Sequence, residues 1–309
     1  MKSLKSGLKI LLGIAGGVLL FVVILSLLRF SPFKQFGKNW ELRNLIHKAE
    51  KAEREGEFYK AIQYLEKIDG NFGRNRRLYS AWLKLALLYE KTNRLLEAKK
   101  ILEKIISESN FSEPIQEAQK ELGNLNIKII FSPLITEEDF VYEVKEGDSL
   151  TKIAQYFNTT VELLKRANSL KEDALRVGMR LKVTPLKFSL LVDKSQNTLT
   201  LKAKDKVVKV YTVSTGLNNV TPVGNFKIIN KIVNPVWYKE GKAIPPGDPE
   251  NILGSHWLGI SQKGYGIHGT TQPETIGKHI TQGCIRMYNQ EVEELYILLP
   301  LGTEVIIRE

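Results

Sequence analysis

The chain has 309 residues, of which 43% are hydrophobic and 26% charged, and its formal net charge is +11. One hydrophobic core rarely organises a chain of this length, so we expect two or three folded units. The positive charge is spread along the chain rather than gathered in a stripe with interleaved aromatic residues, which argues against a nucleic-acid-binding protein. Anionic lipid head groups or acidic cell-envelope polymers are better matched to it.

The N-terminal segment has the features of a membrane anchor. Residues 10–28 carry no charge and are long enough to cross a bilayer as a helix, so we predict a transmembrane helix there and a cytoplasmic tail at 1–9. By the positive-inside rule, Lys2, Lys5 and Lys9 direct the remaining chain across the membrane, into the periplasm or cell wall. A cleaved secretion signal is the competing interpretation, but no small-x-small cleavage site follows the apolar run.

Residues 40–127 show the three-and-four spacing of apolar residues that is typical of amphipathic helices. The pattern repeats after 37 residues, which aligns Ala61 with Ala98. The second copy resembles a tetratricopeptide repeat at Trp82, Leu85, Ala86, Tyr89, Ala98 and Leu102. Two repeats bury little surface, so we expect a third helical segment, 114–127, to cap them. The region is either a docking surface for a protein partner or a spacer between the membrane and the later domains.

Residues 142–183 are predicted to form a strand–helix–helix–strand unit, in which Asp148 or Ser149 caps the first helix and Thr160 the second. The segments YEVKEGDSLTKIA, NTTVELLKRAN and LRVGMRLKV resemble a LysM domain. That resemblance implies binding of N-acetylglucosamine-containing glycans, such as peptidoglycan strands, in a shallow groove. The alternative is a structural module without affinity for sugars. The groove residues that the resemblance implies are Gly147, Asp148, Ser149, Leu150, Thr151, Asn168, Ser169 and Leu170.

Residues 187–309 have a β texture, with short β-branched runs separated by turn residues. The close spacing of these runs predicts a small antiparallel sandwich or barrel. The chain as a whole is therefore expected to be multidomain, with a transmembrane helix, helical repeats, a small βααβ module and a mainly-β C-terminal domain.

The C-terminal domain contains the one cysteine of the sequence, Cys284. A single cysteine is either a buried, inert thiol or a reactive one. His268 lies sixteen residues upstream and can form a thiolate–imidazolium pair with it. Gly283 allows a tight turn that exposes the sulfur and directs backbone N–H groups at its target, as an oxyanion hole requires. Of the other histidines, His47 and His256 are predicted to be structural, whereas spacing alone cannot dismiss His279.

The run from Tyr265 to the C-terminus resembles the YkuD-type L,D-transpeptidase catalytic domain, and the resemblance extends over 187–309. The family pattern of His-Gly followed by Ser/Thr-x-Gly-Cys-Ile/Leu-Arg appears here as HG at 268–269 and TQGCIR at 281–286. Gln282 departs from many members, which have histidine there. The resemblance implies that Cys284 is the nucleophile and His268 its general base, oriented by the Gly269 carbonyl. The backbone N–H groups that would form the oxyanion hole are those of Gln282, Gly283 and Cys284. Arg286 would either bind a substrate carboxylate or form a structural ion pair.

The expected function is that of a membrane-anchored peptidoglycan L,D-transpeptidase that forms 3–3 cross-links between stem peptides. The resemblance implies neither a metal nor an organic cofactor. Two alternatives remain open: an L,D-carboxypeptidase, in which water accepts the acyl group, and a non-enzymatic scaffold that binds the cell wall.

Overall fold

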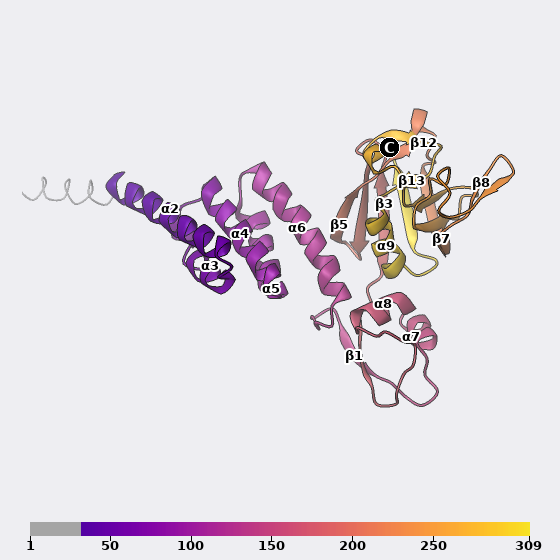
Figure 1. The fold of residues 1–309 in the computed structure, drawn as a ribbon, viewed down its shortest axis with the longest axis horizontal. Helices are drawn as coiled ribbons and strands as arrows, with labels where there is room; N and C mark the ends of the chain where they lie inside the picture. The colour runs from indigo at the N-terminus through magenta and orange to yellow at the C-terminus, as the bar shows by residue number, and fades with distance from the viewer. Residues whose placement is uncertain (1–31) are drawn as a thin grey trace, which may run out of the picture. The chain divides into compact units, whose positions relative to one another are not determined.

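The computed structural model describes residues 32–309, with side chains from residue 37 (Figure 1). The predicted cytoplasmic tail, 1–9, and transmembrane helix, 10–28, lie outside the described residues. Within 32–309, no helix combines the length and the apolar character needed to cross a membrane. The chain divides into two compact units, with the boundary between residues 118 and 119.

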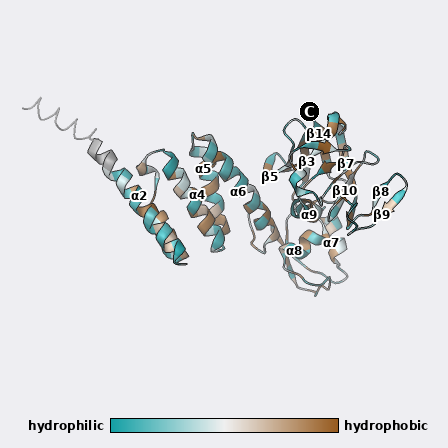
Figure 2. Ribbon diagram, turned by 45° about the horizontal axis from the view of Figure 1, so that its top comes forward, coloured by the Kyte–Doolittle hydropathy of each residue, from teal (hydrophilic) through white to brown (hydrophobic). Residues whose placement is uncertain are grey.

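The first unit contains two helical hairpins, formed by α2 (Pro32–Arg54) with α3 (Phe58–Leu65) and by α4 (Arg76–Lys91) with α5 (Leu95–Glu108). Polar and apolar residues mix along these helices, as expected of amphipathic elements (Figure 2). The 37-residue repeat is visible in the turns, because Gly56 (φ 78°) and Asn93 (φ 60°) adopt the left-handed conformation at equivalent positions. Ala61 and Ala98 are both fully buried. The finer resemblance to tetratricopeptide repeats stays a prediction.

Helix α6 spans Ser112–Phe131, beyond the predicted end at residue 127. The expected boundary is wrong because the last turns of α6 have their own core contacts in the second unit. Ile127 and Ile130 are buried in the hydrophobic core of the C-terminal domain. The side chain of Asn126 also donates to the carbonyl of Val208 at 2.9 Å. The part of α6 after residue 118 therefore belongs structurally to the second unit.

The βααβ module consists of β1 (Phe140–Glu143), α7 (Leu150–Tyr156), α8 (Val161–Ala167) and β2 (Arg180–Val183), with β1 and β2 antiparallel. Its helix caps follow the sequence. Ser149 Oγ accepts from the Lys152 N–H at 3.2 Å and starts α7. Thr160 Oγ1 accepts from the Leu163 N–H at 2.9 Å and starts α8. The Thr160 hydroxyl in turn donates to the Ile297 carbonyl of the C-terminal domain.

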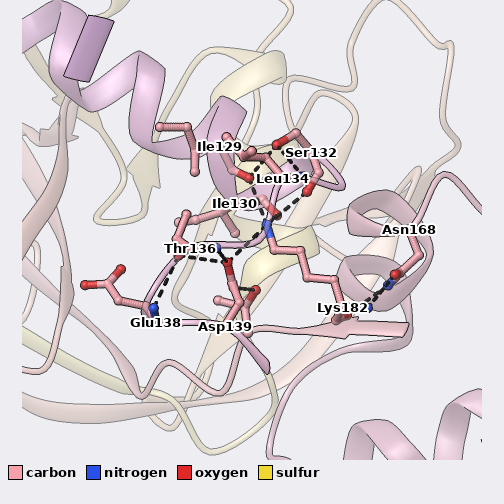
Figure 3. A network of polar contacts seen from close by, with 10 residues as sticks. Ile129, Ile130, Ser132, Leu134, Thr136, Glu138, Asp139, Asn168 and Lys182 are labelled. Atoms are coloured by element: carbon pink, nitrogen blue, oxygen red, sulfur yellow. Dashed lines mark hydrogen bonds and ion pairs between the residues drawn. The ribbon is translucent and has the colours of Figure 1, made fainter. Parts of the chain in front are cut away.

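A buried lysine joins this module to the end of α6 (Figure 3). Lys182 Nζ donates to the carbonyl oxygen of Ile129, in the last turn of α6, at 3.0 Å and to that of Ser132, just beyond the helix, at 2.9 Å. The same nitrogen lies 3.5 Å from Asp139 Oδ2, and both side chains are 2% exposed. Burial lowers the pKa of Lys182, and Asp139 opposes that effect. The module is thus fixed to α6 by a charge that cannot reach solvent.

The C-terminal domain is built on an eight-stranded sheet with the order β13-β11-β10-β7-β14-β3-β4-β5. Helix α9 (Asn289–Leu298) contributes Val292, Leu295 and Leu298 to the core that this sheet covers. The strands are β3 (Phe188–Asp193), β4 (Thr198–Ala203), β5 (Lys206–Thr212), β7 (Gly224–Val233), β10 (His256–Ile260), β11 (Gly266–His268), β13 (Ile285–Arg286) and β14 (Glu304–Arg308). Two small pairs accompany the sheet: β6 (Thr215–Gly216) with β12 (His279–Thr281), and β8 (Trp237–Lys239) with β9 (Lys242–Ile244).

The expectation of a purely antiparallel sandwich or barrel is wrong in one respect. Strands β11 and β13 pair in parallel, as do β14 and β3. Residues 269–284 connect β11 to β13, and residues 194–303 connect β3 to β14. Connections of this length permit parallel pairing, which a tight hairpin does not. One of these parallel pairs, β11 with β13, carries the candidate site.

Candidate active site

The two predicted catalytic residues lie on one face of the paired strands β11 and β13. Ile267 pairs with Ile285, and both are fully buried in the core. Because side chains alternate between the faces of a sheet, His268 is directed to the opposite face, and Cys284, immediately before Ile285, follows the same alternation. The Cys284 sulfur lies 3.8 Å from the carbonyl oxygen of Gly264, two residues before β11 begins. The sheet register thus brings together residues sixteen positions apart in the sequence.

The orientation of the His268 ring is fixed by its neighbours. His268 Nδ1 lies 2.7 Å from the carbonyl oxygen of Gly269. Because a carbonyl can only accept a hydrogen bond, Nδ1 carries the proton and Nε2 is left as the basic nitrogen. Trp257 stacks on the imidazole with ring centroids 5.9 Å apart and an interplanar angle of 17°. Gly266 makes room for this indole, since a Cβ there would lie 2.5 Å from Trp257 Cζ2.

Trp257 is a site residue that sequence reasoning missed. It lies on β10, opposite His268 in the antiparallel ladder with β11. Its Nε1 donates to Asn230 Oδ1 at 3.1 Å, which holds the indole in place. The pairing depends on strand register, and no local motif around Trp257 specifies that register.

The predicted thiolate–imidazolium pair stays a prediction, and burial favours the neutral form of both groups. Burial lowers the pKa of His268 to about 4, and the Arg286 charge adds to this, while the Gly269 carbonyl opposes it. Burial raises the pKa of the Cys284 thiol, although the Gly266 N–H and Arg286 oppose the shift. The thiol is also placed to donate to the Gly264 carbonyl, at 3.8 Å. At neutral pH these shifts favour a thiol on Cys284 and a neutral imidazole on His268.

Arg286 is buried, with 5% of its surface exposed. Its Nη1 donates to Thr275 Oγ1 at 3.0 Å and to Gln272 Oε1 at 3.3 Å. Burial also lowers the pKa of Arg286. These contacts favour the structural alternative, with hydrogen bonds in place of an ion pair. The capture of a substrate carboxylate stays a prediction. The guanidinium fixes residues 272–275 and acts on the two reacting groups through its charge.

The turn before Cys284 differs in detail from the predicted oxyanion hole. Gly283 has φ 121°, a conformation that favours glycine, and a Cβ there would lie 2.5 Å from a ring carbon of Tyr265. Its N–H donates to Thr281 Oγ1 at 3.1 Å, and that hydroxyl donates to the Cys284 carbonyl at 2.6 Å. The Gly283 N–H is therefore engaged within the turn. The N–H groups of Gln282 and Cys284 remain as candidates to stabilise an oxyanion.

The other histidines have different environments. His279 Nδ1 lies 2.8 Å from Thr215 Oγ1, and its Nε2 lies 3.2 Å from Asn197 Nδ2, so both ring nitrogens have partners away from the sulfur. His256 packs on the Tyr296 ring at 4.8 Å, and His47 lies on α2 in the first unit. His268 is therefore the histidine that the sheet directs toward Cys284.

The structure corrects the predicted glycan groove at Leu150 and Asn168. Leu150 is 3% exposed and belongs to the core of the βααβ module. The Asn168 amide donates to the carbonyls of Leu164 at 2.8 Å and Lys182 at 2.9 Å and accepts from the Lys182 N–H (Figure 3). Both side chains therefore make contacts within the βααβ module rather than facing a ligand.

Some of the remaining predicted groove residues have partners within the βααβ module, and others are exposed. Asp148 accepts from the Tyr142 hydroxyl at 2.8 Å, and Ser149 caps α7. Leu170 is half-buried. The surface left for a ligand is formed mainly by Gly147, Thr151 and Ser169, which are exposed.

Comparison with known proteins assigns the family. Over 173 residues the chain is 36% identical to a Bacillus subtilis protein named "Putative L,D-transpeptidase YkuD", an alignment that covers 54% of this chain and 97% of the relative. This chain belongs to the L,D-transpeptidase family. A second B. subtilis relative, "Putative L,D-transpeptidase YqjB", is 42% identical over 126 residues, covering 39% of this chain and 70% of the relative.

Family models define two modules of this L,D-transpeptidase. The L,D-transpeptidase catalytic domain model, YkuD, matches residues 187–307, and the LysM domain model matches 142–184. Both resemblances inferred from the sequence are thus confirmed. Among solved structures, an L,D-transpeptidase from Mycobacterium smegmatis matches with a TM-score of 0.35 and 21% identity, over 43% of this chain and 65% of that one.

Proposed function

We propose that this L,D-transpeptidase is anchored in the cytoplasmic membrane and forms 3–3 cross-links in peptidoglycan through an acyl-enzyme on Cys284. The observation that carries the proposal is the arrangement on β11 and β13, which directs Cys284 and the basic Nε2 of His268 to one face. The donor is a tetrapeptide stem, cut between its third residue and the terminal D-alanine.

The reaction proceeds by two transfers. His268 Nε2 takes the Cys284 thiol proton as the sulfur attacks the carbonyl carbon of the third stem residue. The oxyanion is stabilised by the N–H groups of Gln282 and Cys284. As the C–N bond breaks, the imidazolium returns the proton to the leaving D-alanine nitrogen, and a thioester remains. An amine on a neighbouring stem then loses a proton to His268 and attacks the thioester, which forms the new amide and restores the thiol.

The neutral resting pair suits this sequence of steps. A low pKa keeps His268 unprotonated and available as a base at neutral pH. The raised pKa of Cys284 keeps the sulfur as a thiol until substrate binds. A permanently ionised thiol would be more exposed to oxidation in an extracytoplasmic compartment.

The other parts of the chain bring the site to its polymeric substrate. The uncharged segment 10–28 anchors the protein, and the LysM domain binds glycan strands. The hydrogen bond from Lys182 Nζ to the Ile129 carbonyl holds the LysM domain to α6, and that from the Thr160 hydroxyl holds it to the catalytic domain. Tethering of this kind raises the effective concentration of stem peptides at the active site. The helical hairpins of the first unit are either a docking surface for a protein partner or a spacer between the membrane and the later domains.

The test is an incubation of the full chain, in detergent micelles, with disaccharide-tetrapeptide, followed by mass spectrometry of the products. Cross-linked dimers with release of D-alanine are expected from the wild type, and neither product from Cys284→Ala. Tripeptide without dimers would instead indicate an L,D-carboxypeptidase. Equal product from wild type and Cys284→Ala would refute the assigned chemistry. His279→Gln is the matched control and is expected to retain activity.

A further inference from the structure

Asn289, the first residue of α9, makes contacts that its own helix does not explain. The N-cap of α9 is Tyr288, and no side chain caps the helix. The Asn289 amide instead reaches the point where β10 begins and β11 ends. Its Oδ1 accepts from the N–H groups of Ser255 at 3.1 Å and Thr270 at 2.9 Å, and its Nδ2 donates to the Thr270 carbonyl at 2.9 Å. The side chain thus pairs with Thr270 as a neighbouring strand would.

Two glycines leave room for this amide. A Cβ at Gly269 would lie 2.1 Å from Asn289 Oδ1, and a Cβ at Gly254 would lie 2.2 Å from the same atom. Distances this short mean that no other residue fits at either position without displacing the asparagine. The Gly269 N–H also donates to the His256 carbonyl at 3.1 Å. The Gly269–Thr270 backbone is therefore held by β10 through the Gly269 N–H and by Asn289 through the Thr270 N–H and carbonyl.

Gly269 is the residue whose carbonyl accepts from His268 Nδ1. We propose that Asn289 is a positioning residue for His268: it clamps the Gly269–Thr270 segment so that this carbonyl stays aimed at Nδ1 and Nε2 stays the basic nitrogen. The inference rests on the roles proposed above for His268 and Cys284. Without the clamp, the Gly269 peptide can rotate away, the imidazole gains a second tautomer, and part of the enzyme holds the proton on Nε2, where it cannot accept another from the sulfur.

The test compares Asn289→Ala and Asn289→Asp with the wild-type full chain, and uses Gln290→Ala as the control at the next, exposed position of α9. The first readout is the tautomer of His268, read from the imidazole nitrogens of ¹⁵N-histidine-labelled protein by NMR at pH 7. The wild type is expected to hold the proton on Nδ1, and Asn289→Ala to show both tautomers. Asn289→Asp keeps both acceptor contacts and is expected to lie between them.

The second readout is the rate at which a carbapenem acylates Cys284, followed by intact-protein mass spectrometry. Asn289→Ala is expected to slow acylation roughly 10- to 100-fold, since small misplacements of catalytic groups cost rates of that order. Gln290→Ala should match the wild type in both readouts. A wild-type tautomer and rate in both Asn289 variants would overturn the inference, and so would a slowed rate with an unchanged tautomer.

These readouts separate the inference from the proposed function. If the wild type forms no acyl-enzyme, the proposed chemistry fails, while the tautomer comparison still decides the role of Asn289. The exposure of Asn289 means that its replacement leaves no buried cavity. If Asn289→Ala nevertheless unfolds, Asn289→Asp is compared alone: a mixed tautomer supports the inference, and an unchanged one overturns it.

Discussion

The acid limb of the pH–rate profile is the most specific consequence of the buried imidazole. An exposed histidine titrates at 6.5, whereas burial lowers the pKa of His268 to about 4. The sign follows from the role of His268: it must be neutral to accept the thiol proton, so activity is present above its pKa and is lost below it. Between pH 7 and pH 5, the neutral fraction of a base with a pKa of 6.5 would fall roughly 25-fold. The neutral fraction of a base with a pKa near 4 would fall by only about a tenth.

The assay is the initial rate of Cys284 acylation by a carbapenem from pH 3.5 to pH 9, with adducts counted by mass spectrometry. We expect a nearly constant rate between pH 5 and pH 7 and a fall centred near pH 4. His279→Gln should give the same acid limb, because both nitrogens of His279 already have partners elsewhere. An acid limb near 6.5 in the wild type would contradict this prediction, because it would mean that burial does not lower the pKa of His268.

Three further predictions concern Lys182, Arg286 and Asn168. Lys182→Met should destabilise the second unit by about 3–5 kcal/mol in urea unfolding, because the buried Asp139 carboxylate loses its cationic partner and keeps only its hydrogen bonds to Thr136 and Thr184; a change below about 1 kcal/mol would contradict the stabilising role of the Lys182–Asp139 pair. Arg286→Met should raise the pKa of His268 and shift the acid limb upward, because the Arg286 charge lowers that pKa; an unchanged limb would contradict this. Asn168→Ala should lower the melting temperature of the LysM domain, as expected when about 1–3 kcal/mol of buried hydrogen bonding is lost; reduced glycan affinity at unchanged stability would restore its predicted groove role.

The chemistry of the site could be inferred from the sequence because it is concentrated in short segments. Gly283-Cys284 and His268-Gly269 each combine a reactive side chain with a glycine, and the Gly269 carbonyl does orient the imidazole. The ionisation state could not be inferred, because it depends on how completely the sheet and Trp257 remove water from His268. A histidine in a motif carries no information about its own solvation.

Two predicted groove residues of the LysM domain and the predicted end of α6 are wrong because their contacts come from residues distant in sequence. The resemblance to LysM domains implied that Leu150 and Asn168 line a glycan groove, yet Leu150 fills the core and Asn168 bonds to Lys182. Helix periodicity also placed the end of α6 too early, because Ile130 is buried by a domain more than fifty residues further along the chain. Local patterns identify helices and caps, as at Ser149, but partners distant in sequence decide which surfaces stay exposed.

An acyl-enzyme on Cys284 requires that the acyl group form on this residue and that its formation depend on His268. After incubation with the tetrapeptide donor, the full chain is digested and its peptides are mapped by mass spectrometry. The proposed mechanism predicts an acyl group on the peptide containing Cys284, and a rate of formation that falls roughly 10²- to 10⁴-fold in His268→Gln. Acylation of another residue, or an equal rate in His268→Gln, would contradict it.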